Sequence, residues 1–259
     1  MVPEMPKLTT NGIELYYQVF GEGPVIVFAH GVGGNHAIWF HQVCRFRQTH
    51  RVVTFDHRGF GMSTDPQRLG RSAYSDDLAA LLDHLEVKSC ALVAQSMGGG
   101  TCVGYASQYP QRVDALVLAD TLYGMVLPAD VEPIMVKAKA ATEDLGQIER
   151  VLGTRARESN PSLAELYRQI NSFNATDRHS LQGEYAHQLS CSELESLGIP
   201  VLFIAGEHDV LFPPEAIRMV QKRVSGSEWV ELAGAGHSAF LEQPENFNNH
   251  VADFLLRRV

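Results

Sequence analysis

Three side chains that together can turn a serine into an acyl-transfer nucleophile stand far apart in the chain: Ser96, Asp209 and His237. A serine hydroxyl is a weak nucleophile at neutral pH and needs an adjacent base, for which imidazole has a suitable pKa. The histidine in turn needs a carboxylate that fixes its tautomer and stabilises the imidazolium ion. We predict that Ser96 is the nucleophile, His237 its base and Asp209 the acid that orients the base.

The surroundings of Ser96 fit a nucleophile presented on a sharp turn. The apolar residues 91–94 are typical of a buried strand, and the glycines 98–100 open a helix. Such a turn strains the backbone, so the residues two before and two after the serine must be small, as Ala94 and Gly98 are. The usual pattern is G-x-S-x-G, from which Ala94 departs by one methyl group. A helix starting directly behind Ser96 directs N–H groups towards a developing oxyanion.

The base and the acid are expected on loops that follow strands. His237 lies in the glycine-rich segment 232–238, after the strand-like residues 228–232, and Asp209 follows the apolar run 201–205. Loops at strand ends commonly carry catalytic side chains. Asp120, directly after the run 115–119, is the alternative acid, because a triad is defined by geometry and not by chain position.

The elements that position these residues alternate along the chain. Continuous apolar runs are typical of strands covered on both faces, and the helical spacing between them predicts a mostly parallel, doubly wound α/β sheet with helices on both faces. The strand runs are 25–29, 52–55, 91–94, 115–119 and 201–205, and the helices are expected at 74–85, 214–223 and 244–256. Alternation within residues 7–20, around Asn11-Gly12, predicts an initial β-hairpin.

Residues 122–196 break this alternation. They contain no strand-like run, and helix-forming segments such as 136–141 and 163–170 are separated by Gly, Pro and Asn. We expect a helical cap here, inserted late in the sheet over the carboxyl ends of the strands, with residues 1–121 and 197–259 forming the core. The alternative is that the segment only completes the outer helical layer. Its basic residues either meet a carboxylate substrate or are solvated: Arg150, Arg155, Arg157, Arg168, Arg178 and His179.

Composition narrows the class of protein. The 259 residues carry a formal net charge of −9 and are 45% hydrophobic, which fits one folded soluble chain and makes nucleic acid an unsuitable partner. Neither an export signal nor a membrane-spanning run is recognisable, and cysteines 44, 90, 102 and 191 lack metal-ligand spacing. We therefore expect a cytoplasmic protein without metal or cofactor, either monomer or homodimer.

The order serine, acid, histidine, with these flanking residues, resembles the α/β-hydrolase family. The segment His30-Gly31-Val32-Gly33-Gly34 looks like that family's oxyanion loop, and residues 56–63 match its D-x-R-G-x-G-x-S turn. The resemblance implies that the N–H groups of Val32 and Met97 hold the oxyanion of a tetrahedral intermediate.

The implied reaction is hydrolysis of a small carboxylic ester or lactone through an acyl-enzyme, without a cofactor. Residues 236–245 are similar to enol-lactone hydrolases and small esterases. Hydrolysis of a carbon–carbon bond in a ring-fission dienoate is an alternative, although Ser238 stands where such enzymes often carry Trp. A hydrolase-shaped receptor for a small ligand is the alternative from another class. In the non-catalytic reading, Ser96 is a helix cap and His237 a loop residue.

Overall fold

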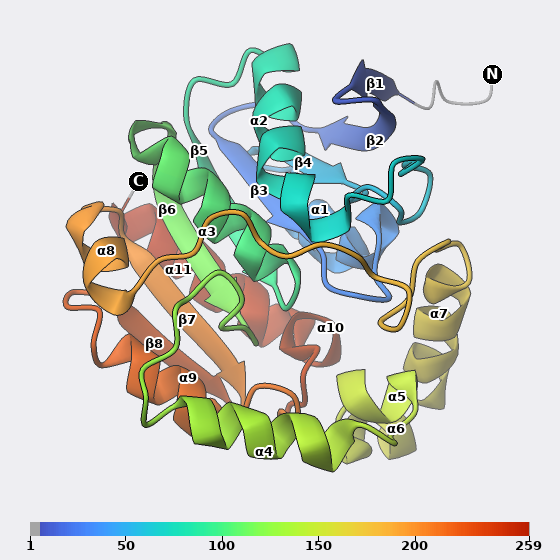
Figure 1. Cartoon of the computed structure of the whole chain (residues 1–259), viewed down its shortest axis with the longest axis vertical. Helices are drawn as coiled ribbons and strands as arrows, with labels where there is room; N and C mark the ends of the chain where they lie inside the picture. Colours follow the sequence, from blue (N-terminus) through green and yellow to red (C-terminus); the bar gives the residue numbers. More distant parts are fainter. Residues whose placement is uncertain (1–5, 259) are drawn as a thin grey trace.

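The computed structural model describes residues 6–258, and within them eight strands form one sheet with helices on both faces (Figure 1). The strand order is β1-β2-β4-β3-β5-β6-β7-β8. Strand β2 is antiparallel to both β1 and β4, and the remaining neighbours are parallel. The predicted α/β class, with its initial hairpin, is confirmed.

The bounds of the strands are β1 (Lys7–Thr10), β2 (Ile13–Phe20), β3 (Val25–Ala29), β4 (Arg51–Phe55), β5 (Cys90–Gln95), β6 (Val113–Ala119), β7 (Val201–Gly206) and β8 (Glu228–Leu232). The α-helices are α1 (Phe40–Phe46), α2 (Tyr74–His84), α3 (Gly98–Gln108), α4 (Glu132–Thr142), α5 (Gln147–Val151), α6 (Thr154–Ser159), α7 (Pro161–Asn171), α8 (Cys191–Ser196), α9 (Pro214–Gln221), α10 (Ala239–Glu242) and α11 (Pro244–Arg258). Within residues 6–258 there are also three 3₁₀ helices, η1 (His36–Trp39), η2 (Gly70–Ala73) and η3 (Pro110–Arg112).

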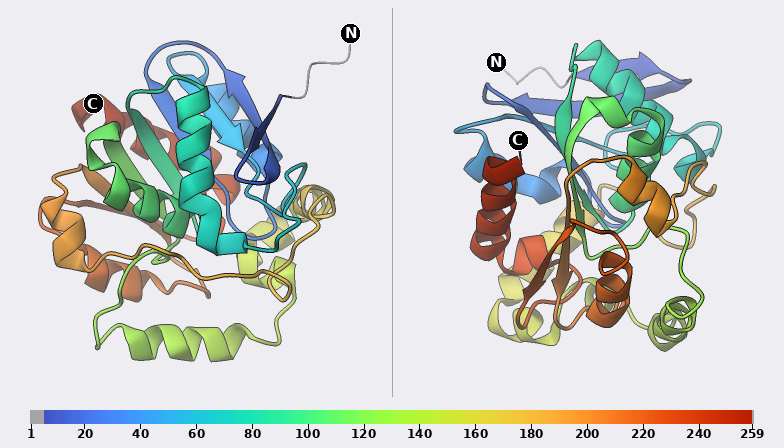
Figure 2. Two further views of the ribbon diagram at one scale, coloured as in Figure 1. Left: turned by 45° about the horizontal axis from the view of Figure 1, so that its top comes forward. Right: turned by 90° about the vertical axis from the view of Figure 1, so that its left-hand side faces the viewer.

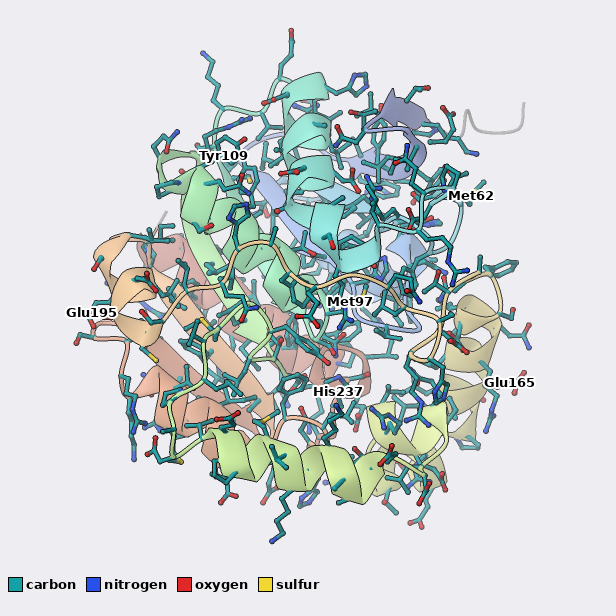
Figure 3. The ribbon with its side chains drawn as sticks, viewed as in Figure 1. Met62, Met97, Tyr109, Glu165, Glu195 and His237 are labelled. Carbon is teal, nitrogen blue, oxygen red and sulfur yellow. The ribbon has the colours of Figure 1, made fainter. Side chains whose placement is uncertain are left out.

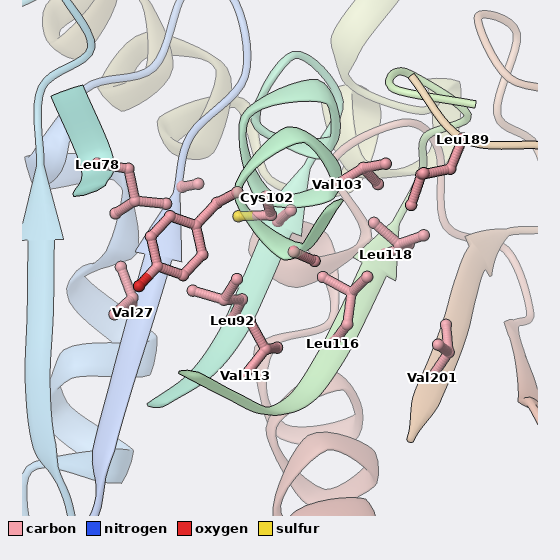
Figure 4. Close-up of a cluster of buried hydrophobic side chains, with 14 of the residues drawn as sticks. Val27, Leu78, Leu92, Cys102, Val103, Val113, Leu116, Leu118, Leu189 and Val201 are labelled. Carbon is pink, nitrogen blue, oxygen red and sulfur yellow. The ribbon is translucent and has the colours of Figure 1, made fainter. Parts of the chain in front are cut away.

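The central strands bury side chains on both faces, which explains their continuous apolar sequences. On β3 and β5, Val27 and Leu92 point into one core, which helices α2, α3 and α9 cover (Figure 4). Ile26 and Val93 point into the opposite core, which α1 and α11 cover. Because alternate residues of a strand face opposite ways, a strand between two helical layers has no polar face.

The strand order reverses direction at β3. From β3 the chain goes to β4 on one side, and β5 then pairs with β3 on the other side. The loops after β3 and β5 therefore separate at the carboxyl edge of the sheet, where open α/β sheets bind their ligands. Ser96 follows β5 directly, and Gly31 lies two residues after the end of β3.

Helices α4 to α7 lie between β6 and β7 in the sequence, within the segment expected to form a cap over this edge. Figure 2 shows α4 set apart from the main body, below the ends of the strands, while α8 packs against the core through Leu194. The division at residues 122 and 196 stays a prediction, and we use "cap segment" for residues 122–196. Residues 1–5 and 259, included in the expected core, lie outside the described residues. Across residues 6–258, every helix is either too short or too polar to cross a membrane.

The turn after β4 is held by a buried ion pair. The Arg58 guanidinium donates two hydrogen bonds of 2.6 Å to the Asp77 carboxylate on α2, and both side chains are at most 2% exposed. Asn11, in the hairpin turn, donates a third hydrogen bond to Asp77 at 3.0 Å. Through these contacts the turn at residues 56–63 connects the hairpin with α2.

We expect Arg58→Met to lower the free energy of unfolding by about 3–5 kcal/mol, because it leaves the Asp77 carboxylate buried without its cation. The control is Arg168→Met, since Arg168 and its partner Glu165 are 56% and 58% exposed. That change should cost at most about 1 kcal/mol. Urea unfolding of the wild type and the two variants measures both changes in the free energy of unfolding. Equal decreases in the two variants would contradict the role assigned to Arg58.

Candidate active site

Ser96 lies between the end of β5 and the start of α3, in the left-handed backbone region with φ of +49°. This conformation is uncommon for a residue with a Cβ atom. The Ser96 N–H donates to the Ala119 carbonyl at 3.2 Å, and the Thr121 hydroxyl donates to the Ser96 carbonyl at 2.7 Å. Ala119 ends β6 and Thr121 follows it by two residues, so the neighbouring strand and its loop hold the expected strained turn in place.

Close packing explains why the residues around Ser96 are small. A Cβ atom on Gly98 would collide with the carbonyl of Ala29, and one on Gly31 would lie 2.9 Å from the Ser96 Cβ. Ala94 is fully buried in β5, and its methyl group packs in the core. The departure from the usual glycine at this position is therefore accommodated, whereas Gly98 is required.

His237 and Asp209 are in direct contact. The Asp209 Oδ2 lies 2.9 Å from the His237 Nδ1, and the two side chains are at most 2% exposed. The Asp209 Oδ1 accepts the N–H groups of Leu211 and Phe212 at 2.8 and 3.0 Å. The Phe212 ring stacks on the imidazole at 5.7 Å. With the Nδ1 proton directed at Asp209, Nε2 is left with the lone pair that a base needs.

Ser96 and His237 are brought to the same corner of the sheet edge. Gln95, next to Ser96, donates a hydrogen bond of 2.9 Å from its side chain to the His237 carbonyl. Among residues 6–258, the Ser96 hydroxyl has no hydrogen-bond partner, His237 Nε2 included. Hydrogen bonds of this kind are often loose in ligand-free enzymes and tighten around the substrate.

Asp120, the alternative acid, has a different set of contacts. It is fully buried, and its carboxylate accepts the N–H groups of Gly206 at 2.7 Å and Ala239 at 3.2 Å. Burial and the neighbouring Asp209 raise the pKa of Asp120 well above its ordinary value. Asp120 thus ties the end of β7 to the start of α10, and it is Asp209 that contacts the imidazole.

The two residues whose N–H groups are expected to bind an oxyanion are both held, through their carbonyls, by tyrosines of the cap segment. The Tyr167 hydroxyl donates to the Val32 carbonyl at 3.0 Å, and Gln147 donates to the same carbonyl at 3.2 Å. The Tyr185 hydroxyl donates to the Met97 carbonyl at 2.8 Å. Within residues 6–258, the N–H groups of Val32 and Met97 have no acceptor, which leaves them available to a ligand.

These cap contacts were not visible in the sequence. Tyr167 shares the apolar face of α7 with Leu163 and Ile170, so its spacing indicates core packing only. Nothing in the local pattern marks Gln147 or Tyr185. Figure 3 shows Met97 and His237 near the middle of the molecule, between the strand ends and the cap helices, and Glu165 on the outer side of α7.

A cavity of about 320 Å³ lies between the cap segment and the loops after β7 and β8. His237 and Val210 line it on the core side, and Leu145, Arg150 and Leu152 on the cap side. A narrow recess next to it is lined by Val32, Tyr167 and again His237. The imidazole therefore stands between the expected oxyanion loop and a space large enough for part of a small substrate.

The basic residues of the cap segment divide into two groups. Arg150, Arg155 and Arg157 line the cavity of about 320 Å³. Arg168 is more than half exposed and lies 3.3 Å from Glu165, and His179 is exposed. Arg178 donates to the carbonyls of Glu143 and Leu145 at 3.0 and 3.2 Å.

Two further histidines, His30 and His57, are buried under the expected oxyanion loop. His30 contacts the Gly31 carbonyl through Nδ1 at 2.8 Å and accepts the His57 N–H through Nε2 at 3.0 Å. His57 contacts the Thr101 hydroxyl at 2.8 Å. Both rings therefore hold loops by hydrogen bonds. In the described part of the chain, no three His, Cys, Asp or Glu side chains gather as a metal site would require.

Comparison with known proteins identifies the family. Residues 24–144 and 137–244 match the family model described as the alpha/beta hydrolase fold. The chain belongs to the α/β-hydrolase family.

Among its α/β-hydrolase relatives, the 3-oxoadipate enol-lactonase 2 of Acinetobacter baylyi is 27% identical over 97% of this chain and 96% of its own length. An esterase structure from Thermogutta terrifontis superposes with a TM-score of 0.81 at 26% identity, covering 97% of this chain and 98% of that one. The enol-lactonase of Burkholderia xenovorans gives 0.78 at 26% identity, with 97% and 100% covered. The predicted resemblance to esterases and enol-lactonases is confirmed.

The buried histidines make the stability of this α/β-hydrolase depend on pH. Burial lowers the pKa of His30 from 6.5 to about 4, and burial together with repulsion from His30 lowers the pKa of His57 well below 6.5. Below pH 6.5 the unfolded chain therefore binds more protons than the folded chain. The stability contributed by the neutral rings is complete above pH 6.5 and falls towards pH 4, by about 1.4 kcal/mol per pH unit for each ring.

Urea unfolding between pH 7 and pH 4.5 measures this slope, and His57→Phe should reduce it by about 1.4 kcal/mol per pH unit. The control is His250→Gln, because His250 is exposed on α11. If stability depended on pH equally in His57→Phe and in the control, the lowered pKa assigned to His57 would be contradicted.

Proposed function

We propose that this α/β-hydrolase cleaves a small carboxylic ester or lactone through an acyl-enzyme, with Ser96 as nucleophile, His237 as general base and Asp209 as the residue that orients the base. The observation that carries the proposal is the contact of 2.9 Å between Asp209 and the Nδ1 of His237, beside a serine held on a left-handed turn. Relatives named as esterases and enol-lactonases support this substrate class.

In the proposed reaction, His237 Nε2 accepts the Ser96 proton while Oγ bonds to the carbonyl carbon of the substrate. The N–H groups of Val32 and Met97 stabilise the resulting oxyanion. The imidazolium then gives its proton to the leaving oxygen, and the bond between carbonyl carbon and leaving oxygen breaks. Water, deprotonated by His237, attacks the acyl-enzyme and releases the acid and Ser96.

The surroundings of Asp209 support its role over that of Asp120. An orienting carboxylate must be charged when the imidazolium forms, and Asp209 accepts two backbone N–H groups in addition to its contact with His237. Asp120 has a raised pKa and faces backbone N–H groups, so its proposed part is structural.

We also propose that the protein works in the cytoplasm. All four cysteines are free thiols in the structure, one of them exposed, which supports a reducing compartment.

Ser96→Ala and His237→Ala should each lower kcat by about 10⁴-fold or more on 4-nitrophenyl butyrate, because each removes a partner that acts only with the other. Stopped-flow and steady-state rates test this, together with a panel of lactones and dienoates. Steady ester or lactone turnover that stops in Ser96→Ala supports the proposal. Turnover of dienoates alone supports carbon–carbon hydrolysis, and labelling without turnover supports a receptor.

Asp209→Asn should lower kcat by about 10³–10⁴-fold, since the amide no longer stabilises the imidazolium. Asp120→Asn is the matched change, and its effect on kcat should be at least about tenfold smaller, because this side chain meets only backbone N–H groups. If Asp120→Asn proved the more damaging of the two, the acid would have to be reassigned.

Tyr167 and Tyr185 are proposed as positioning residues for the oxyanion peptides. Tyr167→Phe and Tyr185→Phe each remove one hydrogen bond to a peptide carbonyl and should lower kcat about 2- to 10-fold, with KM nearly unchanged. Affinity for a boronic acid, which forms a tetrahedral adduct on the serine, should weaken by a similar factor. Tyr109→Phe is the control, since Tyr109 lies at the far end of α3. A change in KM alone would argue for a substrate contact instead.

A further inference from the structure

The cavity beside His237 is unusually positive for this chain. Arg150, Arg155 and Arg157 line it together with the imidazole, whereas the whole protein has a formal net charge of −9. Glu149 is its one acidic lining residue, and the Glu149 carboxylate already accepts the Gly146 N–H at 2.9 Å as part of a helix cap.

None of the three guanidinium groups has a carboxylate partner within residues 6–258. Arg150 donates to the Thr142 carbonyl at 2.5 Å, and Arg157 donates to the Leu152 carbonyl and the Thr154 hydroxyl at 3.2 and 3.0 Å. Elsewhere on the surface, Arg112 and Arg223 do have carboxylate partners, Asp83 and Asp130, each at 2.7 Å. The cavity therefore concentrates cations that the fold leaves without counter-ions.

Arg150 is the most constrained of the three. It is half-buried, and burial and the nearby Arg178 both lower its pKa. Carbonyls at and just beyond the end of α4, those of Thr142, Glu143 and Leu145, accept hydrogen bonds from these two arginines and hold them side by side. A guanidinium keeps its charge in proteins, so a half-buried pair of this kind is stabilised when an anion binds.

We propose that Arg150, supported by Arg155 and Arg157, binds a carboxylate of the substrate, and that this carboxylate belongs to the leaving group. The proposal rests on the proposed function, in which the His237 imidazolium gives its proton to the leaving oxygen. The leaving part must therefore lie next to the imidazole, and the cavity that the imidazole lines is the positive one. The substrate class is an ester of a carboxylate-bearing alcohol, or a lactone whose carboxylate lies on the ring-oxygen side of the acyl bond.

The experiment compares two acetyl esters with leaving groups of similar basicity, 4-acetoxyphenylacetate and its methyl ester. Arg150→Gln should lower kcat/KM about 10- to 100-fold for the charged ester, the range expected for losing a charge-assisted hydrogen bond, and leave the neutral ester within about 2-fold. Arg150→Lys, which keeps the charge, should recover part of the loss. Arg168→Gln, on the outer face of α7, is the matched control and should change neither rate.

A second pair places the charge on the acyl side: 4-nitrophenyl hydrogen succinate and 4-nitrophenyl butyrate. The proposal is supported if Arg150→Gln lowers kcat/KM for the charged ester of the first pair and does not do so for the charged ester of the second pair. Dependence in the second pair only, or equal loss on charged and neutral esters, overturns it.

Binding without turnover separates this proposal from the proposed function. The product 4-hydroxyphenylacetate should bind to Ser96→Ala by calorimetry, and Arg150→Gln introduced into that variant should weaken binding about tenfold or more. If product binding depends on Arg150 but the wild-type protein has no esterase activity, the anion site is supported and the proposed reaction is overturned. Esterase activity that requires Ser96, with product binding that ignores Arg150, would overturn the anion site alone.

Discussion

The left-handed backbone at Ser96 is the constraint on which the site depends. A non-glycine residue in this conformation costs of order 1–3 kcal/mol unless its surroundings hold it there. The end of β6 supplies that hold through the Ala119 carbonyl and the Thr121 hydroxyl. Gly98 lets α3 start against the carbonyl of Ala29, which a side chain would prevent. The serine is thus held at the sheet edge because three strands, β3, β5 and β6, are packed around one turn.

The cap segment is joined to this turn by polar contacts as well as by packing. Tyr167 and Tyr185 donate to the carbonyls of Val32 and Met97, and Asn174 donates to the Gly34 carbonyl at 3.1 Å. A displacement of the cap would break these bonds and free the two peptides that the proposed mechanism uses. In the proposed enzyme, cap position and oxyanion stabilisation are therefore coupled, and a substrate that orders the cap also orders the catalytic backbone.

The local sequence was sufficient to predict the strands and helices, but not the side-chain contacts between them. Strands β3 to β7 are buried on both faces, so their apolar runs were unambiguous, and Asn11-Gly12 marked the hairpin turn. The choice between Asp120 and Asp209 could not be made in this way, because both follow neighbouring parallel strands and end at the same edge. Only the side-chain directions, which depend on packing with the His237 loop, separate them. The polar role of the Tyr167 hydroxyl could not be predicted, because Tyr167 lies on the apolar face of α7, where its spacing indicates core packing.

Charged side chains lie on both the core side and the cap side of the proposed site. Burial, and after it the neighbouring Asp209, raise the pKa of Asp120 well above its ordinary value. The Asp209 carboxylate contacts the imidazole at 2.9 Å, and formation of the imidazolium neutralises that charge. On the other side of the imidazole the cap contributes Arg150 and its neighbours. A leaving group that carries a carboxylate would then lie between the arginines of the cap segment and an imidazolium whose charge is balanced by Asp209. That arrangement favours binding of the anion without drawing the proton away from the leaving oxygen.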